Sequence, residues 1–209
     1  MSDKFKEKYR IATARANWWD YRNPGLYFIT ICTHGMECCL GEITDDEMHL
    51  SAIGEIAATC WTDIPKHFTF VKVHTMVVMP NHVHGILEIL PNTNVETLHV
   101  ETLHVETLHA TSLRMIPGIY VQTLHATSLP IPPAKNLKMA AISPPKGSLA
   151  SIIRSYKSAV SKKVHLFHST FDWQERYYDN IIRDLPAYQR IEAYIANNVG
   201  SWCNDKFYQ

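Results

Sequence analysis

Residues 71–90 read VKVHTMVVMPNHVHGILEIL, two strand-like runs that meet at Pro80 and Asn81. Both runs are rich in apolar and β-branched residues, which favour extended structure. Proline cannot donate a hydrogen bond to a sheet ladder, so it belongs in a turn between strands and not inside one. The stretch therefore predicts a β-hairpin with strands at 71–79 and 82–90.

The chain on either side of this hairpin predicts helices as well as strands. We expect two further strands, at 26–33 and 171–182, and a short two-stranded ribbon at 41–51. Apolar residues recur at helical spacing in three segments, each of which predicts a helix. The first spans 53–64, and the second begins after a cap at Ser148. The third runs from Asp184 to about Asn198, with Gly200 as its C-terminal stop. This mixture predicts an α+β fold.

One segment, 92–145, differs from the rest of the sequence. It holds three consecutive copies of Val-Glu-Thr-Leu-His at 95–109, followed by a proline-rich stretch. A five-residue repeat matches neither the helix period of about 3.6 residues nor the strand period of about 2. We interpret 92–145 as a disordered insertion in a single domain that spans residues 1–209.

The composition excludes several classes of protein. Hydrophobic residues make up 46% and charged residues 19% of the chain, as in ordinary globular proteins. No apolar run approaches the ~20 residues of a bilayer span, and the first ten residues lack the apolar core of a secretory signal. The five cysteines form no C-x-x-C pair, which favours a reducing compartment over a disulfide framework. We expect a cytoplasmic protein.

The net charge of zero conceals an uneven distribution. Residues 36–64 hold seven acids and no Lys or Arg, whereas 146–183 hold seven bases against three acids. A polyanion could meet the basic segment while the acidic segment faces away from it, although the same pattern also fits simple solvated surfaces.

The first candidate for chemistry is His82-Val83-His84. Alternate residues of a strand share one face, so the two imidazoles can hold one divalent cation, and Glu88 follows on the same face. Imidazole ligands alone suit zinc, copper, iron or nickel. A metal-dependent hydrolase that uses His82, His84 and Glu88 is therefore one reading of the motif.

The second candidate is Tyr194, in the last expected helix. It lies at the edge of the apolar stripe, and Asn198 is its neighbour one turn later. A tyrosine at the edge of a stripe beside an amide oxygen is a better candidate for chemistry than one in its centre. Tyr156, by contrast, lies within the apolar stripe of its own helix and is assigned to packing.

Three motifs in this order carry a family resemblance. The segments MPNHVH (79–84), WQERYYDNIIR (173–183) and YIANN (194–198) resemble those of single-tyrosine HUH transposases, and most closely those of REP-associated tyrosine transposases. The resemblance covers about residues 20–90 and 147–203, and it fails across 92–145. This sequence departs from the pattern at Val199, where the family often has proline.

The resemblance implies a ferredoxin-like antiparallel sheet with helices packed on it. It further implies an enzyme that nicks and rejoins single-stranded DNA with hairpin ends through a 5′-phosphotyrosine intermediate. In that reading Tyr194 is the nucleophile, and the metal ligands for Mg²⁺ or Mn²⁺ are His82, His84 and Asn198. The resemblance places such an enzyme in the cytoplasm with the nucleoid, and it leaves both a homodimer and a monomer open.

Basic and aromatic residues near the second motif are the expected DNA contacts. Lysines bind phosphates, and exposed aromatic rings stack on unpaired bases. The residues expected to do so are Lys157, Lys162, Lys163, Trp173, Arg176 and Tyr177. A domesticated nucleic-acid-binding module without catalysis remains the other alternative.

Overall fold

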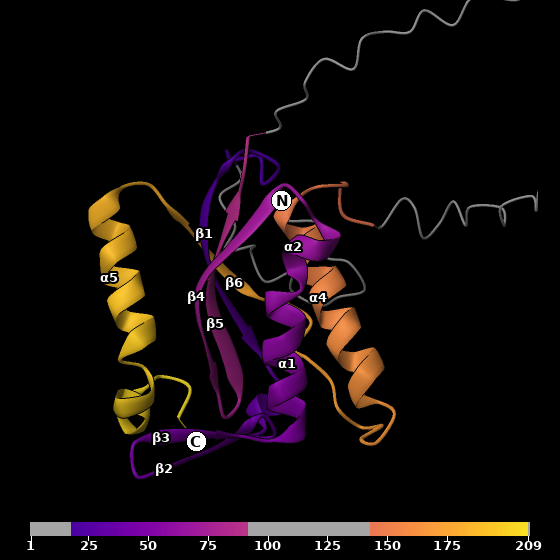
Figure 1. Cartoon of the computed structure of the whole chain (residues 1–209), viewed down its shortest axis with the longest axis vertical. Helices are drawn as coiled ribbons and strands as arrows, with labels where there is room; N and C mark the ends of the chain where they lie inside the picture. Colours follow the sequence, from indigo (N-terminus) through magenta and orange to yellow (C-terminus); the bar gives the residue numbers. More distant parts are fainter. Residues whose placement is uncertain (1–17, 92–142, 209) are drawn as a thin grey trace, which may run out of the picture. The chain divides into compact units, whose positions relative to one another are not determined.

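The computed structural model describes residues 18–91 and 143–208. Its centre is a four-stranded sheet in the order β4-β5-β1-β6, and each neighbouring pair is antiparallel (Figure 1). The sheet consists of β1 (Gly25–Cys32), β4 (Val71–Met79), β5 (His82–Ile89) and β6 (Tyr178–Ile182). With α1 (Ala52–Thr62) and α4 (Leu149–Val164), the chain follows the β-α-β-β-α-β order of ferredoxin-like folds. The predicted fold class is confirmed.

The β4–β5 hairpin forms around Pro80 and Asn81 as predicted. Met79 lies opposite His82 across the turn. The segment after β1 holds the turn from outside, because the N–H of Thr33 donates to the carbonyl of Asn81 at 2.9 Å and the N–H of Leu40 donates to that of Pro80 at 2.9 Å. These bonds fix the start of β5, where the two histidines lie.

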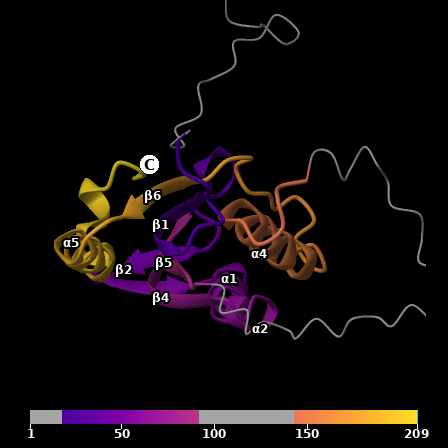
Figure 2. The same cartoon turned by 90° about the horizontal axis from the view of Figure 1, so that it is seen from above.

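Helices α1 and α4 cover one face of the sheet and close the larger core (Figure 2). Trp61 of α1 is fully buried in this core. Its indole lies over Gly85 of β5, so closely that a Cβ atom at position 85 would stand 2.3 Å from the ring. The predicted cap of α4 is present, since the Ser148 hydroxyl accepts a hydrogen bond from the N–H of Ser151.

Helix α5 (Leu185–Ala196) packs on the opposite face of the sheet (Figure 2). Its cap is Asp184, whose carboxylate accepts from the N–H of Ala187 at 2.7 Å. A smaller apolar cluster centred on Ile86, Ile182 and Ile195 joins the helix to the sheet. Because strand side chains alternate, β5 gives Val83 to the larger core and its histidines to the side of α5.

Smaller elements complete the fold. The predicted ribbon at 41–51 is confirmed as β2 (Gly41–Thr44) and β3 (Glu47–Leu50). Its two-residue turn places Asp45 and Asp46 at φ values of 53° and 59°, as the favoured twist of such hairpins requires. The short helices are η1 (His34–Met36), α2 (Ile64–His67) and η2 (Val199–Asn204).

Three expectations need correction or lie outside the described residues. Strand β6 is shorter than 171–182, because Phe171 and Trp173 turn into the larger core and this part meets the sheet through a single bridge to Thr33. Helix α5 ends at Ala196, and Gly200 lies inside η2. The insertion proposed at 92–145 lies outside the described residues except for 143–145.

Two further sequence expectations can be compared with the structure. All five cysteines are free thiols. Of the helices in the two described ranges, none combines the length and the apolar character needed to cross a membrane.

Candidate active site

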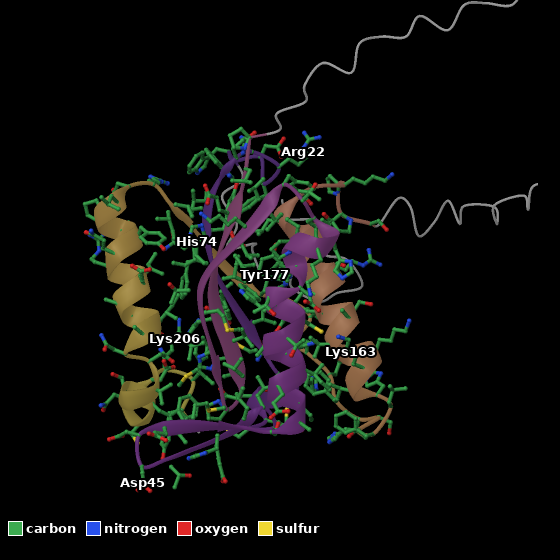
Figure 3. The ribbon with its side chains drawn as sticks, viewed as in Figure 1. Arg22, Asp45, His74, Lys163, Tyr177 and Lys206 are labelled. Carbon is green, nitrogen blue, oxygen red and sulfur yellow. The ribbon has the colours of Figure 1, made fainter. Side chains whose placement is uncertain are left out.

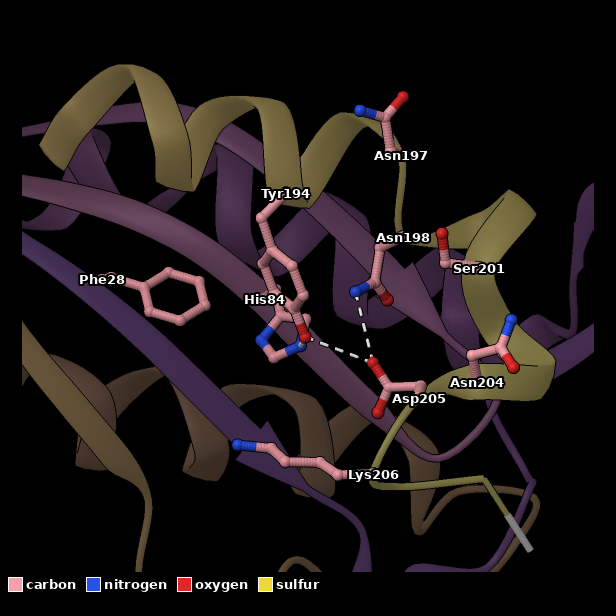
Figure 4. Close-up of a pocket in the computed structure, with 9 residues that line it drawn as sticks. All are labelled: Phe28, His84, Tyr194, Asn197, Asn198, Ser201, Asn204, Asp205 and Lys206. Atoms are coloured by element: carbon pink, nitrogen blue, oxygen red, sulfur yellow. Dashed lines mark hydrogen bonds between the residues drawn. The ribbon is translucent and has the colours of Figure 1, made fainter. Parts of the chain in front are cut away.

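An open pocket of about 440 Å³ lies between the sheet, α5 and the segment that follows η2 (Figure 4). This volume is within the range of about 300–1,000 Å³ that is typical of ligand sites. The residues that line it are Phe28, His84, Tyr194, Asn197, Asn198, Ser201, Asn204, Asp205 and Lys206.

His84 lines this pocket, and His82 lies beside it. Both are buried, with exposed fractions of 0% and 1%, and their ring centroids are 4.4 Å apart. The strand alternation predicted for the motif therefore holds, and Val83 between them points into the larger core.

Asn81 fixes the protonation of the His82 ring. The Asn81 amide nitrogen donates to the carbonyl of Phe207 at 2.8 Å, and a carbonyl can only accept. The amide oxygen therefore faces His82 Nδ1, at 2.8 Å, and accepts a hydrogen bond from the N–H there. The lone pair of His82 is consequently on Nε2.

His84 is oriented by a different neighbour. Its Nδ1 is 2.7 Å from the hydroxyl of Thr30, the residue opposite it on β1. Its Nε2 faces the pocket, 3.2 Å from the hydroxyl of Tyr194. A partner on Nδ1 that leaves Nε2 for a ligand is the arrangement usual for metal-binding histidines.

Both imidazoles are neutral at physiological pH. Burial is the main cause that lowers the pKa of His82 and of His84 from 6.5 to about 3, and the nearby ammonium of Lys206 acts in the same direction. A neutral imidazole keeps the lone pair that a metal ion needs.

Asp205 joins the two histidines, although no pattern in the sequence pointed to it. One ligand atom from each of His82, His84 and Asp205 lies within 4.8 Å of the others. Asp205 follows η2 in a segment without periodicity, so the sequence carries no signal that would bring it back to β5. Two imidazoles and a carboxylate make a ligand set for a divalent metal ion.

Two buried atoms support this assignment. His82 Nε2 and Asn198 Oδ1 have no hydrogen-bond partner among the described residues. Asn198 is 1% exposed, and its amide nitrogen donates to Asp205 Oδ2 at 3.3 Å, which leaves the oxygen unpaired. Unpaired buried acceptors beside a carboxylate fit a bound cation, which would satisfy them.

Tyr194 stands at the wall of the pocket, with 41% of its side chain exposed. Its hydroxyl is 3.2 Å from His84 Nε2 and donates to Asp205 Oδ2 at 3.2 Å (Figure 4). Burial and then the charge of Asp205 raise the pKa of this phenol above its usual value. The structure thus brings Tyr194 together with His82, His84 and Asn198.

Glu88 and Tyr156 lie away from this group. The Glu88 carboxylate is 2.8 Å from His74 Nε2, and it is not part of the His82, His84 and Asp205 group. The ligand set proposed for a hydrolase is therefore wrong in its third member. Tyr156 is 2% exposed, and its hydroxyl donates to the carbonyl of Ala57, which confirms its packing role.

The residues expected to contact DNA are not gathered around the pocket. Lys157, Lys162 and Lys163 belong to α4, on the face of the sheet opposite α5 (Figures 2 and 3). The ammonium of Lys157 donates to the carbonyls of Gln174, Glu175 and Arg176, so it holds a loop of the chain.

The two aromatic residues expected to stack on bases also pack against the protein. Trp173 is 4% exposed, and its ring contacts those of Tyr156 and Phe171. Its expected stacking role needs correction, because a buried ring offers no face to a base. Tyr177 is half-buried against the larger core. Arg176 is exposed, but it lies in the loop held by Lys157.

Comparison with known proteins relates this chain to an uncharacterized protein and to solved structures of transposases. No family model matches the sequence. An uncharacterized protein of Haemophilus influenzae is 32% identical over 198 residues, which cover 93% of this chain and 91% of the relative.

Two solved structures differ in how closely they resemble this chain. A REP-associated tyrosine transposase, solved bound to a REP hairpin, has a TM-score of 0.52 and 14% identity, covering 92% of this chain and 74% of its own. At this identity the likeness shows a shared fold alone. A transposase candidate of Deinococcus radiodurans, with 11% identity over 88% of this chain and 97% of its own, has a TM-score of 0.41, which is too low to support an argument. The chain therefore has a transposase-like fold and belongs to the same family as the uncharacterized Haemophilus influenzae protein.

Proposed function

We propose that this protein nicks and rejoins single-stranded DNA in a metal-dependent reaction, with Tyr194 as the nucleophile. The observation that carries the proposal is the position of the Tyr194 hydroxyl. It lies 3.2 Å from His84 Nε2 and 3.2 Å from Asp205 Oδ2, at the mouth of an open pocket. A nucleophile beside candidate metal ligands is the arrangement that phosphoryl transfer needs.

The metal would be held by His82, His84 and Asp205, with the amide oxygen of Asn198 as a fourth ligand. We propose Mg²⁺ or Mn²⁺, and expect Mn²⁺ to bind better in vitro because two imidazoles are soft ligands for magnesium. A divalent ion held by these residues would supply Lewis-acid polarisation of the non-bridging oxygens of a phosphate.

Tyr194 must lose its proton to attack a phosphate. Its raised pKa makes the free phenolate rare at neutral pH, so a base must take the proton as the bond to phosphorus forms. The Asp205 carboxylate already accepts a hydrogen bond from this hydroxyl. The tyrosine oxygen then bonds to phosphorus, the bond to the 3′ oxygen breaks, and that oxygen takes up a proton as a free 3′-OH.

The same site can reverse the step. The 5′-phosphotyrosine retains the energy of the broken phosphodiester, so a second 3′-OH can attack it, rejoin the strand and restore the phenol. We propose single-stranded DNA with hairpin ends as the substrate, in line with the hairpin bound by the transposase of similar fold. A cytoplasmic, nucleoid-associated location follows from this proposal, and a homodimer stays a prediction.

A covalent adduct on a denaturing gel tests the proposal. With hairpin-bearing single strands and Mn²⁺, the wild-type protein should shift to a protein–DNA band, and Tyr194→Phe should form no such band while it still binds the strand. Tyr188→Phe, on the same helix, is the matched control and should form the band at the wild-type rate. Salt-sensitive binding without any adduct would instead favour a nucleic-acid-binding module.

A further inference from the structure

One exposed aromatic residue lies close to the candidate site, at the open edge of the sheet. Tyr178 is the first residue of β6, the edge strand next to β1, and 55% of its side chain is exposed. In the pairing of the strands, Thr30 of β1 lies opposite His84 on one side and opposite Tyr178 on the other. Directly paired residues point to the same face of a sheet. Tyr178 therefore stands on the face of the metal-ligand candidates, two strands or roughly 10 Å from His84.

A lysine links this tyrosine to the pocket. Lys206 lines the pocket beside Asp205, and its side chain runs below Phe28 and His84 in the view of Figure 4. Its ammonium lies 5.9 Å from the centre of the Tyr178 ring and 4.6 Å from that of Phe207. The positive charge is thus placed between the pocket and the exposed ring.

The chemistry of this pair matches one nucleotide of a single strand. An exposed aromatic face stacks on any base, and an ammonium binds a phosphate as a point charge. If the scissile phosphate of a DNA strand lies at Tyr194, the nucleotide next to that phosphate would lie close to Tyr178 and Lys206. Lysines on α4 lie on the other face of the sheet and cannot serve the same nucleotide.

We propose that Tyr178 and Lys206 form a subsite for the nucleotide next to the scissile phosphate, with Tyr178 stacking on its base and Lys206 binding its phosphate. This inference rests on the proposed function, because it takes the pocket as the place where a DNA strand is cut. Both are positioning residues, which orient the strand and do not touch the reacting atoms.

Strands with a single abasic site, moved one position at a time, test the subsite. For the wild-type protein, an abasic site beside the scissile phosphate should slow adduct formation about 5- to 150-fold, the fold-change expected from stacking. Tyr178→Ala should be equally slow with intact and abasic strands at that position. Tyr178→Phe should restore the difference in rate between intact and abasic strands. Phe167 is an exposed aromatic residue after α4, and Phe167→Ala is the control that should keep this difference.

Lys206→Gln tests the phosphate contact. The slope of log affinity against log salt concentration should become shallower by about 0.7, the value for one phosphate of a single strand. An unchanged slope would show that Lys206 only packs against the aromatic rings. If Tyr178→Ala slows adduct formation by the same factor with every strand, including the strand that is abasic beside the scissile phosphate, the role of Tyr178 is structural and the proposed subsite is wrong.

The same strands separate this inference from the proposed function. Binding of the abasic series is also measured with Tyr194→Phe as the background, which needs no cleavage. If the wild-type protein forms no adduct but binding remains sensitive to the base through Tyr178, the nicking function fails and the subsite stands. If adducts form and the abasic series shows no dependence on Tyr178, the function stands and the subsite fails.

Discussion

At the scale of single residues, the ability of the site to bind a metal ion depends on which nitrogen of each imidazole is already hydrogen-bonded. Asn81 and Thr30 occupy the Nδ1 atoms of His82 and His84, so His82 Nε2 has no partner among the described residues and His84 Nε2 faces the hydroxyl of Tyr194. Asp205 adds the nearby carboxylate. The local hydrogen bonds therefore orient the imidazoles before any metal binds, which lowers the cost of ordering the ligands.

Metal binding should depend on Asp205 and not on Glu88. We expect His84→Ala and Asp205→Ala each to lower Mn²⁺ affinity by at least about 10-fold, because each removes a direct ligand, and losses of about 10–100-fold are already typical of outer-shell changes. Glu88→Gln should leave the affinity unchanged, since Glu88 pairs with His74. Isothermal calorimetry measures the Mn²⁺ affinity of all three variants. A loss of affinity in Glu88→Gln alone would support the ligand set of the hydrolase, His82, His84 and Glu88.

The stability of the metal-free protein should fall as pH drops below about 6.5. The unfolded chain protonates both histidines near that pH, whereas burial holds their pKa values at about 3 in the folded protein. The unfolded state thus binds more protons between these values, so acid favours unfolding.

Urea unfolding in EDTA at a series of pH values measures this effect. His82→Gln should reduce the pH slope by up to about 1.4 kcal/mol per pH unit, the contribution of one proton. His49→Gln, an exposed histidine of β3, is the control and should leave the slope as it is. A wild-type slope near zero would contradict the buried, neutral state of the pair.

At the scale of the elements, β5 connects the two faces of the molecule. It sends Val83 and Leu87 into the larger core and His82, His84 and Ile86 toward α5. The position of the histidines is therefore coupled to the packing of α1, which presses Trp61 against the same strand at Gly85.

Gly85→Ala should destabilise the fold. The added methyl would stand 2.3 Å from the Trp61 ring, in a core without space to move it, and such overpacking costs about 1–3 kcal/mol. Gly200→Ala is the matched control, because no atom lies within 4 Å of a Cβ at that position. Chemical denaturation compares the two, and an equal, small effect would show that β5 and α1 adapt freely.

At the scale of the whole molecule, the described residues 18–91 and 144–208 belong to one compact unit. Each residue of the candidate site belongs to that unit, and residue 145 already contacts the cap of α4 through its carbonyl. The cost of closing a loop grows by only about 0.6 kcal/mol for each doubling of its length. The length of 92–142 should therefore matter little for folding.

Replacement of 92–142 by a short Gly/Ser linker should preserve the fold, the Mn²⁺ affinity and the Tyr194 adduct. Circular dichroism, calorimetry and the denaturing gel measure these three properties. The full-length chain is the reference. A shortened protein that folds and binds Mn²⁺ but no longer binds hairpin DNA would place a substrate contact in the replaced segment.

The sequence by itself determined the local structure of this protein. Two β-branched, apolar runs separated by Pro80 and Asn81 predicted the β4–β5 hairpin, and strand alternation predicted the shared face of His82 and His84. Helical periodicity predicted α1, α4 and α5, and cap residues predicted where α4 and α5 begin. These patterns succeed because the side-chain directions of strands and helices repeat with fixed periods.

Only the tertiary structure decided what surrounds those elements. Asp205 and Lys206 reach the site through an aperiodic segment that folds back over β5, and Trp173 turned into the core while Tyr178 stayed exposed. The lysines of α4 came to lie on the other face of the sheet. Such placements depend on contacts between residues far apart in the chain, and a residue's own neighbours in sequence carry no record of them.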